Sequence, residues 1–297
     1  MQTHTVLSCF SSSESWSILS DIERSIKAKI EAVGTPLKDW NIQINYGIKT
    51  GFNDAFIIDS VRRNEILNAC QSEDERQRTA EIIRPILRGR DIKRYSYEYA
   101  DQYIIATFPS RQYNIDDYPT LKQFLLSFGI ERLEQTGKEY IIDGEKVKAR
   151  KKTNNKWFET QDSISYWDEF SKPKIVWAEL SRTGNSFAYS DDGAMVLNTC
   201  YILSFNDNEF HEKELNTLLG FLNSNVALFY LDIISSKLDE TGWRWLKQFV
   251  ELIPVPVQMV FKEDGQLTDK DSASINAQLY QQLGLSPDET EYLERRI

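Results

Sequence analysis

The residues with the clearest chemistry are the cations between positions 144 and 156, GEKVKARKKTNNK, where six basic side chains accompany one acid. Trp157 follows directly and adds an aromatic plane. Ammonium and guanidinium groups at this density bind phosphate oxygens, and an exposed aromatic ring can stack on flat groups. The segment therefore predicts contact with a polyanion. The alternative is a lysine-rich loop that is only solvated.

The charge of the whole chain is −10, which taken alone speaks against a nucleic-acid partner. The average hides a gradient, because residues 1–83 have a net charge of −3, residues 84–156 of +5 and residues 157–297 of −12. A basic middle between acidic ends suits a surface that meets a polyanion at one patch and faces water or another protein elsewhere.

The sequence lacks the residues that several kinds of catalytic site require. The sequence has two histidines, His4 and His211, and neither stands in a zinc-protease motif. It shows no GxSxG elbow and no glycine-rich nucleotide loop after a strand. Its three cysteines, Cys9, Cys70 and Cys200, form no CxxC pair, which predicts idle or buried thiols. The sequence therefore predicts no metal site and gives no support to hydrolase, kinase or dehydrogenase chemistry.

The sequence gives weak support to a nuclease and none to an amino-methyltransferase. A metal-dependent nuclease needs clustered carboxylates and a lysine, and the nearest approximation is Glu81 with Asp91-Ile92-Lys93. An amino-methyltransferase needs a glycine-rich adenosylmethionine loop and an Asn/Asp-Pro-Pro-aromatic tetrapeptide, and neither string occurs. A catalytic domain is therefore not visible in this sequence.

Length and composition indicate a globular chain. Its 297 residues allow one large or two modest domains, with 41% apolar and 27% charged residues. No stretch approaches 18 uninterrupted apolar residues, and the first 16 residues lack the pattern of a signal peptide. We expect a soluble, cytoplasmic protein without a membrane partner.

The first half of the chain predicts these elements. Apolar residues from Trp16 to Val33 recur at helical spacing after a serine run, and Gly34 and Pro36 should end that helix. The stretch 41–59 alternates like two strands, which form a hairpin or a closely spaced strand pair. Further predictions are helices over 61–69 and 74–83, a strand over 102–108, a helix from Pro119 to about residue 134, and an exposed loop or hairpin over 137–155.

The second half predicts strands first and helices afterwards. The expected strands span 174–180, 186–189 and 195–205, and the expected helices span 212–222, 225–234, 243–249, 273–283 and 287–296. The fold class is α+β, a mixed β-sheet with helical segments at the N-terminus and C-terminus. We expect a helix and linker over 1–40, a central domain over 41–260 and a helical tail over 261–297.

Seven segments, in this order, resemble the TaqI-like C-terminal specificity domain of adenine-specific methyltransferases and of type IIG restriction-modification enzymes. The resemblance spans about residues 14–297. The segments are Gly47–Ile58, Ile86–Tyr95, Lys156–Glu159, Lys172–Ile175, Leu218–Ser224, Ile253–Pro256 and Leu279–Ser286.

The resemblance implies a target-recognition module that selects a sequence on double-stranded DNA and is not itself an enzyme. Separate modules of the same system, a methyltransferase and in some cases a nuclease, would perform the chemistry, and S-adenosylmethionine and Mg²⁺ are expected only there. In the family the methyltransferase precedes this region. The sequence thus represents either a piece of a longer enzyme or a separate subunit.

Phosphate contacts are expected at the recurring turns of the family. Lys49, Thr50 and Asn53 surround Gly51 and offer hydrogen-bond donors, and the basic turn from Arg88 to Arg94 offers guanidinium and ammonium groups. The alternative is structural: Asn53 only closes its turn, and Asp91 pairs with a neighbouring arginine. The predicted phosphate-binding residues are Lys49, Thr50, Asn53, Arg88, Arg90, Lys93 and Arg94.

Base contacts are expected where the sequence departs from the family pattern. One candidate is the basic segment described first, and the other is the turn SRTGNS over 181–186. The predicted residues are Lys146, Lys148, Arg150, Lys151, Lys152, Lys156, Arg182, Thr183 and Asn185.

Two other functions remain open. The acidic final third could make the chain a protein-interaction domain that docks a methyltransferase module through its helical end. A divergent magnesium-dependent nuclease would depend on Asp91. Six tryptophans lie mostly within apolar periodicity and are expected in the core, namely Trp16, Trp40, Trp167, Trp177, Trp243 and Trp245.

Overall fold

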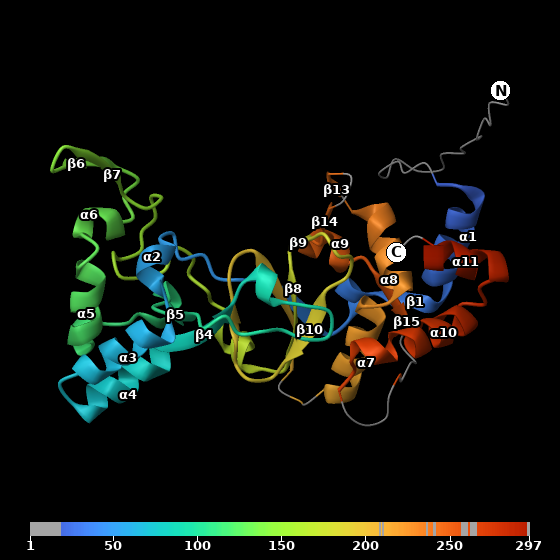
Figure 1. The fold of residues 1–297 in the computed structure, drawn as a ribbon, viewed down its shortest axis with the longest axis horizontal. Coiled ribbons are helices and arrows are strands. Elements are labelled where there is room, and N and C mark those ends of the chain that lie inside the picture. Colours follow the sequence, from blue (N-terminus) through green and yellow to red (C-terminus); the bar gives the residue numbers. More distant parts are fainter. Residues whose placement is uncertain are drawn as a thin grey trace.

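A computed structural model describes residues 19–207, 209, 211–235, 237–239, 242–256, 261 and 266–295. The molecule is elongated, with two sheets in the middle and helices at both ends (Figure 1). We call α2 to α6 with hairpin β6–β7 the distal end, and α1 with α7 to α11 the helical end. This confirms the predicted α+β class.

The first helix, α1 (Asp21–Val33), begins at a capping box in which Ser20 and Glu23 bond each other's backbone N–H groups. Its buried residues, Ile26 and Ile30, are four positions apart and therefore share one face. It ends at Gly34, as predicted. Trp16, expected in the same helix, lies outside the described residues.

The first sheet is antiparallel and has the order β10-β8-β12-β2. Both of its faces are covered, because Ile175 and Trp177 of β8 belong to one hydrophobic cluster and Val176 belongs to another. This explains why every residue of β8 is buried. Its strands are β2 (Ile42–Tyr46), β8 (Lys174–Ala178), β10 (Phe187–Ser190) and β12 (Cys200–Phe205).

The second sheet has the order β11-β4-β5-β3 and is mixed, because β11 pairs with β4 in parallel. Its strands are β3 (Ile57–Ile58), β4 (Ile83–Leu87), β5 (Tyr103–Ile105) and β11 (Met195–Val196). The predicted hairpin over 41–59 is wrong, since β2 and β3 lie in different sheets and α2 (Asn53–Phe56) stands between them. The single strand predicted over 195–205 likewise divides into β11 and β12.

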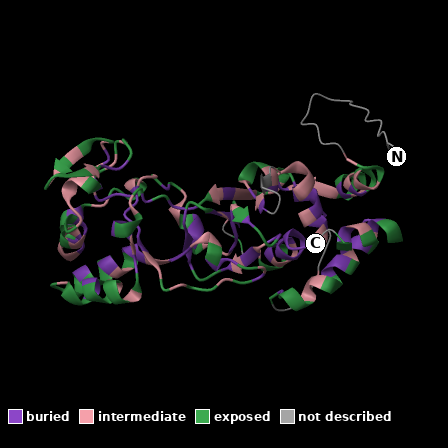
Figure 2. Ribbon diagram, turned by 45° about the horizontal axis from the view of Figure 1, so that its top comes forward, coloured by how far each residue is buried: buried purple, intermediate pink, exposed green. Residues whose placement is uncertain are grey.

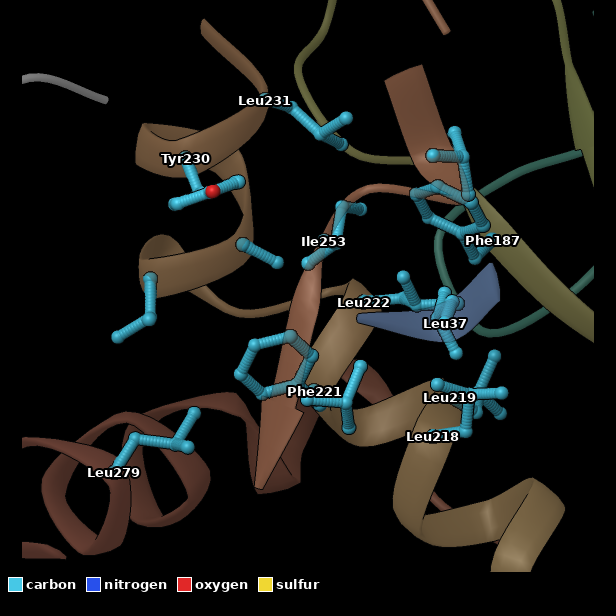
Figure 3. Packing of buried hydrophobic residues seen from close by; sticks show 14 of the residues in the cluster. Leu37, Phe187, Leu218, Leu219, Phe221, Leu222, Tyr230, Leu231, Ile253 and Leu279 are labelled. Carbon is cyan, nitrogen blue, oxygen red and sulfur yellow. The ribbon is translucent and has the colours of Figure 1, made fainter. Parts of the chain in front are cut away.

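The helical end packs around the largest apolar cluster, which includes Phe187, Phe221 and Leu279 (Figure 3). Strand β1 (Gly34–Pro36) pairs with β15 (Pro254–Pro256) beside this cluster. The helices are α7 (Glu212–Leu222), α8 (Asn225–Ile234), α9 (Lys247–Val250), α10 (Ser272–Gln282) and α11 (Pro287–Arg295).

Helices α7 and α8 confirm the predicted bounds. No single helix among the described residues is long and apolar enough to cross a membrane; α7 and α8, bent by 66° at their junction, meet the length and composition only as a pair, and their apolar residues lie in the core.

The helix predicted over 243–249 is only partly present. Its first residues form β14 (Gly242–Arg244), which pairs with β9 (Leu180–Ser181) and β13 (Lys237–Asp239), and α9 begins at Lys247. Trp245 explains the difference, because its backbone N–H bonds the carbonyl of Glu179 and its side chain is buried.

The distal end has its own apolar cluster, built on Phe56, Ile66, Leu121 and Leu133. Gly129 has a φ of +86°, and this left-handed residue divides the helix predicted from Pro119 into two. The helices are α3 (Ser60–Ala69), α4 (Glu73–Ile82), α5 (Pro119–Leu126) and α6 (Ile130–Leu133). Hairpin β6 (Glu139–Ile142) and β7 (Glu145–Lys148) projects above them, exposed and half-buried in Figure 2.

Candidate nucleic-acid interface

Three extended segments run parallel and end at the same edge of the second sheet. Val196 pairs with Leu87, and Ile48 forms a parallel bridge with Leu197. Backbone hydrogen bonds join the segments, from Leu197 N–H to the Leu87 carbonyl (3.0 Å) and from the N–H of the following residue to the Ile48 carbonyl (3.0 Å). The residues that continue each segment therefore emerge side by side.

Those continuing residues are Lys49, Arg88 and Asn198. Lys49 and Asn198 are exposed, and Arg88 is partly exposed. The sheet thus brings together two predicted cationic turns that lie almost forty residues apart in sequence. Asn198 and the exposed Thr199 beside it were not predicted. Only the parallel pairing of β11 with β4 reveals their place.

In the turn after Leu87, the first arginine, Arg88, is bonded to a carboxylate of the same turn. Arg88 donates from Nε and Nη2 to the two carboxylate oxygens of Asp91 at 2.9 and 2.8 Å, and its backbone N–H binds the same group. Burial raises the pKa of Asp91, but these hydrogen bonds outweigh burial and leave that pKa below its ordinary value. The predicted pairing of Asp91 with an arginine is confirmed.

The rest of this turn, η2 (Gly89–Asp91) and the residues after it, presents two exposed cations. Arg90 is exposed, and so is Lys93, whose ammonium donates to the Arg90 carbonyl at 2.9 Å. Gly89 lies against Ala178 and Thr199, so the turn sits at the junction of the two sheets. A hypothetical nuclease role for Asp91 conflicts with the bidentate grip of Arg88.

The turn over 49–53 closes on itself. The hydroxyl of Thr50, a buried side chain, donates to Asn53 Oδ1 at 2.6 Å and accepts the backbone N–H of Phe52 at 3.1 Å. Gly51 has a φ of +78° and supplies the left-handed conformation that the turn requires. Lys49 and Asn53 are therefore accessible to a phosphate and Thr50 is not.

Arg150 has a different role from the predicted base contact. Its side chain is 4% exposed, and its guanidinium donates to four backbone carbonyls at 2.6 to 2.9 Å. Burial lowers its pKa to about 10, so it stays charged at neutral pH. The four carbonyls belong to Leu133, Thr50, Trp157 and Glu159. Arg150 thus joins the segments that carry the exposed cations and is unavailable to a base in this structure.

Exposed lysines surround this buried hub. Asp162 connects two of them electrostatically, because Lys49 and Lys151 both oppose the rise in its pKa that burial causes. Lys156 extends over the Phe158 ring, with 5.5 Å between Nζ and the ring centre. The exposed lysines of the segment are Lys146, Lys148, Lys151, Lys152 and Lys156.

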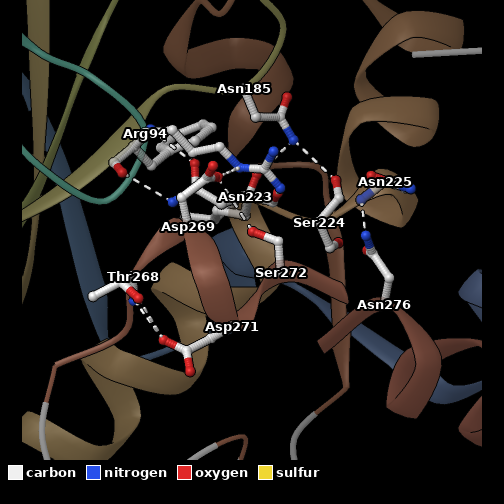
Figure 4. A network of polar contacts seen from close by, with 12 residues as sticks. Arg94, Asn185, Asn223, Ser224, Asn225, Thr268, Asp269, Asp271, Ser272 and Asn276 are labelled. Atoms are coloured by element: carbon white, nitrogen blue, oxygen red, sulfur yellow. Dashed lines mark hydrogen bonds and ion pairs between the residues drawn. The ribbon is translucent and has the colours of Figure 1, made fainter. Parts of the chain in front are cut away.

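The second predicted reader, the turn over 181–186, lies beside Arg94. Arg94 donates to the Asn223 carbonyl at 2.6 Å and pairs with Asp269 at 3.4 Å (Figure 4). The amide of Asn223 in turn bonds both backbone groups of Phe187. These contacts hold Arg94 against the end of α7, so its side chain also serves the fold.

A pocket of about 260 Å³ opens at this point. Arg94, Trp243 and the exposed residues Arg182 and Thr183 line it. Asn185 is buried and uses its amide N–H groups on the carbonyls of Leu222 and Ser224, so it holds the α7–α8 junction. Arg182 and Thr183 are accessible, and Asn185 is structural.

The two predicted readers face the same side of the molecule. In Figure 1, hairpin β6–β7 and the sheet of β9, β13 and β14 both stand along its upper side, at some distance from each other. Among the described residues there is no group of three or more histidine, cysteine or acidic side chains placed to hold a metal ion.

Comparison with known families confirms the predicted resemblance over the central part of the chain. The sequence pattern of the TaqI-like C-terminal specificity domain matches residues 84–255. No curated protein matches the chain.

Two solved structures are similar at low identity. They are the type IIG restriction endonuclease BpuSI (13% identity, TM-score 0.49, 93% of this chain) and the type IIL restriction-modification enzyme MmeI in complex with DNA (12%, 0.44, 80%). The matches cover 28% and 26% of those chains, so this chain spans about a quarter of their length. Since the family pattern covers more than half of the sequence, the chain belongs to the TaqI-like C-terminal specificity domain family.

Proposed function

We propose that this chain selects a sequence on double-stranded DNA as the target-recognition module of a restriction-modification enzyme of the type IIG kind. The observation that carries the proposal is the shared sheet edge, where Lys49, the Arg88 turn and Asn198 emerge together. Arg90, Lys93 and the lysines that follow Arg150 are exposed as well, and Arg150 links their segment to the Thr50 carbonyl beside Lys49. Such a surface supplies the phosphate neutralisation on which DNA affinity depends.

Affinity and sequence choice are assigned to different residues. Flexible lysines next to the body of the protein suit phosphate contacts, which position a duplex without reading it. The projecting hairpin and the Arg182 turn are the segments that can reach base edges. Methyl transfer and cleavage belong to modules outside this sequence, and S-adenosylmethionine and Mg²⁺ would act there.

The test is the salt dependence of duplex binding. We expect affinity to fall with salt by about 0.9 logarithmic units per logarithmic unit of salt for each phosphate contact. Replacing Lys151 and Lys152 by alanine should lower that slope by up to about 2 and weaken binding to all sequences alike. Lys213→Ala and Lys270→Ala, two exposed lysines of the helical end, serve as the matched control. Binding that ignores salt, or an equal effect of both pairs, would contradict the proposal.

A second function is favoured by the charge of the final third, a net −12 over 157–297. In this alternative the helical end docks a methyltransferase module and the chain does not read DNA. Calorimetry with mixed-sequence duplex and with the companion module separates the two. If the chain binds the companion module and calorimetry detects no binding to any duplex, the protein-docking alternative is correct.

A further inference from the structure

Hairpin β6–β7 stands apart from both sheets. It is a two-stranded antiparallel unit whose turn residues, Asp143 and Gly144, have φ values of +50° and +84°. Positive φ at both central residues defines a type I′ turn, the tightest connection that matches the twist of two strands. At the base, the N–H of Ala149 bonds the Lys138 carbonyl at 2.9 Å, next to the buried Arg150. The hairpin is therefore a fixed projection.

The register gives the hairpin two different faces. Tyr140 pairs with Val147 on the half-buried face, and the Tyr140 hydroxyl donates to Glu134 at 2.7 Å just after α6. The opposite face carries Ile141, with Lys146 directly across from it. Because side chains alternate along a strand, nothing on the half-buried face can cover these two residues.

Ile141 is the anomaly of this face. Its side chain is 79% exposed, more than any other large apolar residue in the described part of the chain. A β-branched residue favours a strand, which is consistent with isoleucine at this position. Threonine favours a strand as well and would expose less apolar surface to water. Lys146 and Lys148 lie on the same face, where Glu139 pairs with Lys146 at 2.8 Å and leaves Lys148 as the cation of this face outside that ion pair.

We infer that this hairpin enters the major groove of duplex DNA and that Ile141 contacts the C5 methyl group of a thymine. The inference rests on the proposed function. The major groove is about 12 Å wide and admits a two-stranded ribbon, whereas the minor groove, at about 6 Å, does not. In unmodified DNA the thymine methyl is the apolar group that the major groove displays. Lys146 and Lys148 then lie where the flanking phosphates attract them.

The experiment is a double-mutant cycle that combines a substitution at Ile141 with the replacement of thymine by uracil in the DNA. The preferred duplex is first selected from a randomised pool, and each preferred thymine is then replaced by uracil, which removes only the methyl group. Wild-type protein should lose about fourfold in affinity at one thymine, the worth of one buried methyl group. Ile141→Ser should show the same loss on the thymine duplex and should no longer distinguish thymine from uracil. Ile141→Val should keep the discrimination.

The control variant is Val61→Ser on α3, which changes another exposed aliphatic residue, 64% exposed, away from the hairpin. It should bind both duplexes as the wild type does. The inference is overturned if no thymine-to-uracil change affects the wild type, or if Ile141→Ser still discriminates. A wild-type protein that binds no selected duplex overturns the proposed function instead. The uracil series on wild-type protein needs no variant to fold.

Discussion

The two basic segments of the chain, 88–94 and 144–156, each divide their cations between internal and exposed positions. In the Arg88 turn and at Arg150, guanidinium groups are engaged by a carboxylate or by four carbonyls inside the protein. In the hairpin and at Lys151 and Lys152, ammonium groups are exposed. Arginine offers five donors in a planar array and suits several fixed acceptors, whereas lysine is a mobile, strongly hydrated charge. In these two regions the cations that are bonded inside the protein are arginines and the exposed cations are mostly lysines, with Arg90 an exposed arginine of the Arg88 turn.

Lys174 is the exception that tests this rule. It is a fully buried lysine on β8, and its ammonium donates to the Phe170 carbonyl at 2.7 Å. Burial lowers its pKa to about 8, since no acid pairs with it closely enough to compensate fully.

The largest effect is expected for Arg150→Met. The substitution leaves four carbonyls without their donor, and a buried unsatisfied group costs about 1–3 kcal/mol. We expect the free energy of unfolding, measured by urea denaturation, to fall by at least about 3 kcal/mol. Arg150→Lys should recover less than half, because one ammonium cannot serve four carbonyls. A loss below about 1 kcal/mol would show that Arg150 is not the hub of the distal end.

Asp91→Asn should cost about 2 kcal/mol at pH 7, because it removes the charge that Arg88 grips. The pKa of Asp91 is lowered below its ordinary 3.8 in the folded state, so its contribution is present above that value. The contribution disappears as the pH falls through the folded pKa. Unfolding of the two proteins at a series of pH values should therefore converge under acid conditions. A difference that does not shrink as the pH falls below 3.8 would contradict this account.

Lys174→Met should stabilise the protein at pH 7 by no more than about 1–2 kcal/mol, since an apolar side chain replaces a buried charge while the Phe170 carbonyl loses its donor. The folded pKa of about 8 lies below the ordinary 10.5. The wild type therefore loses stability as the pH falls from 10.5 to 8. Below pH 8 the contribution of Lys174 to the free energy of unfolding no longer changes. The advantage of the variant should grow over the same interval. Thermal melting at pH 7, 8, 9 and 10 measures it, and a constant difference would be a contrary result.

The smallest effect on stability is expected for Lys151→Ala with Lys152→Ala. Both side chains are exposed, and such changes stay within about 0.5 kcal/mol. Urea denaturation of the double variant should superimpose on that of the wild type. A clear destabilisation would place these lysines with the internal arginines and remove the contrast between the regions.

The sequence predicted most helices well, because their signals are local. Helix α8 begins at a serine cap, and its apolar residues repeat at helical spacing. The hairpin predicted over 41–59 failed because β2 pairs with β12, and β3 with β5, through contacts that depend on the tertiary fold. Local alternation cannot identify such partners.

The candidate site shows the same division. The pairing of Asp91 with an arginine three residues away follows from local spacing and was foreseen. The burial of Arg150 was not, since its four carbonyl partners lie between 7 and 100 residues away in the sequence. Asn198 was missed for a similar reason, because its neighbours at the sheet edge come from β4 and from the segment after β2.

The way the hairpin is attached has an evolutionary consequence. Residues 139–148 touch the rest of the chain mainly through one face, and the backbone pair Lys138–Ala149 closes them off from the body. A ribbon of this kind can be lengthened by pairs of residues or exchanged for another without moving the arginine beneath it. Under the proposed function, natural variants would acquire new target sites by exchange of this hairpin alone, with the sheets and the buried arginine unchanged.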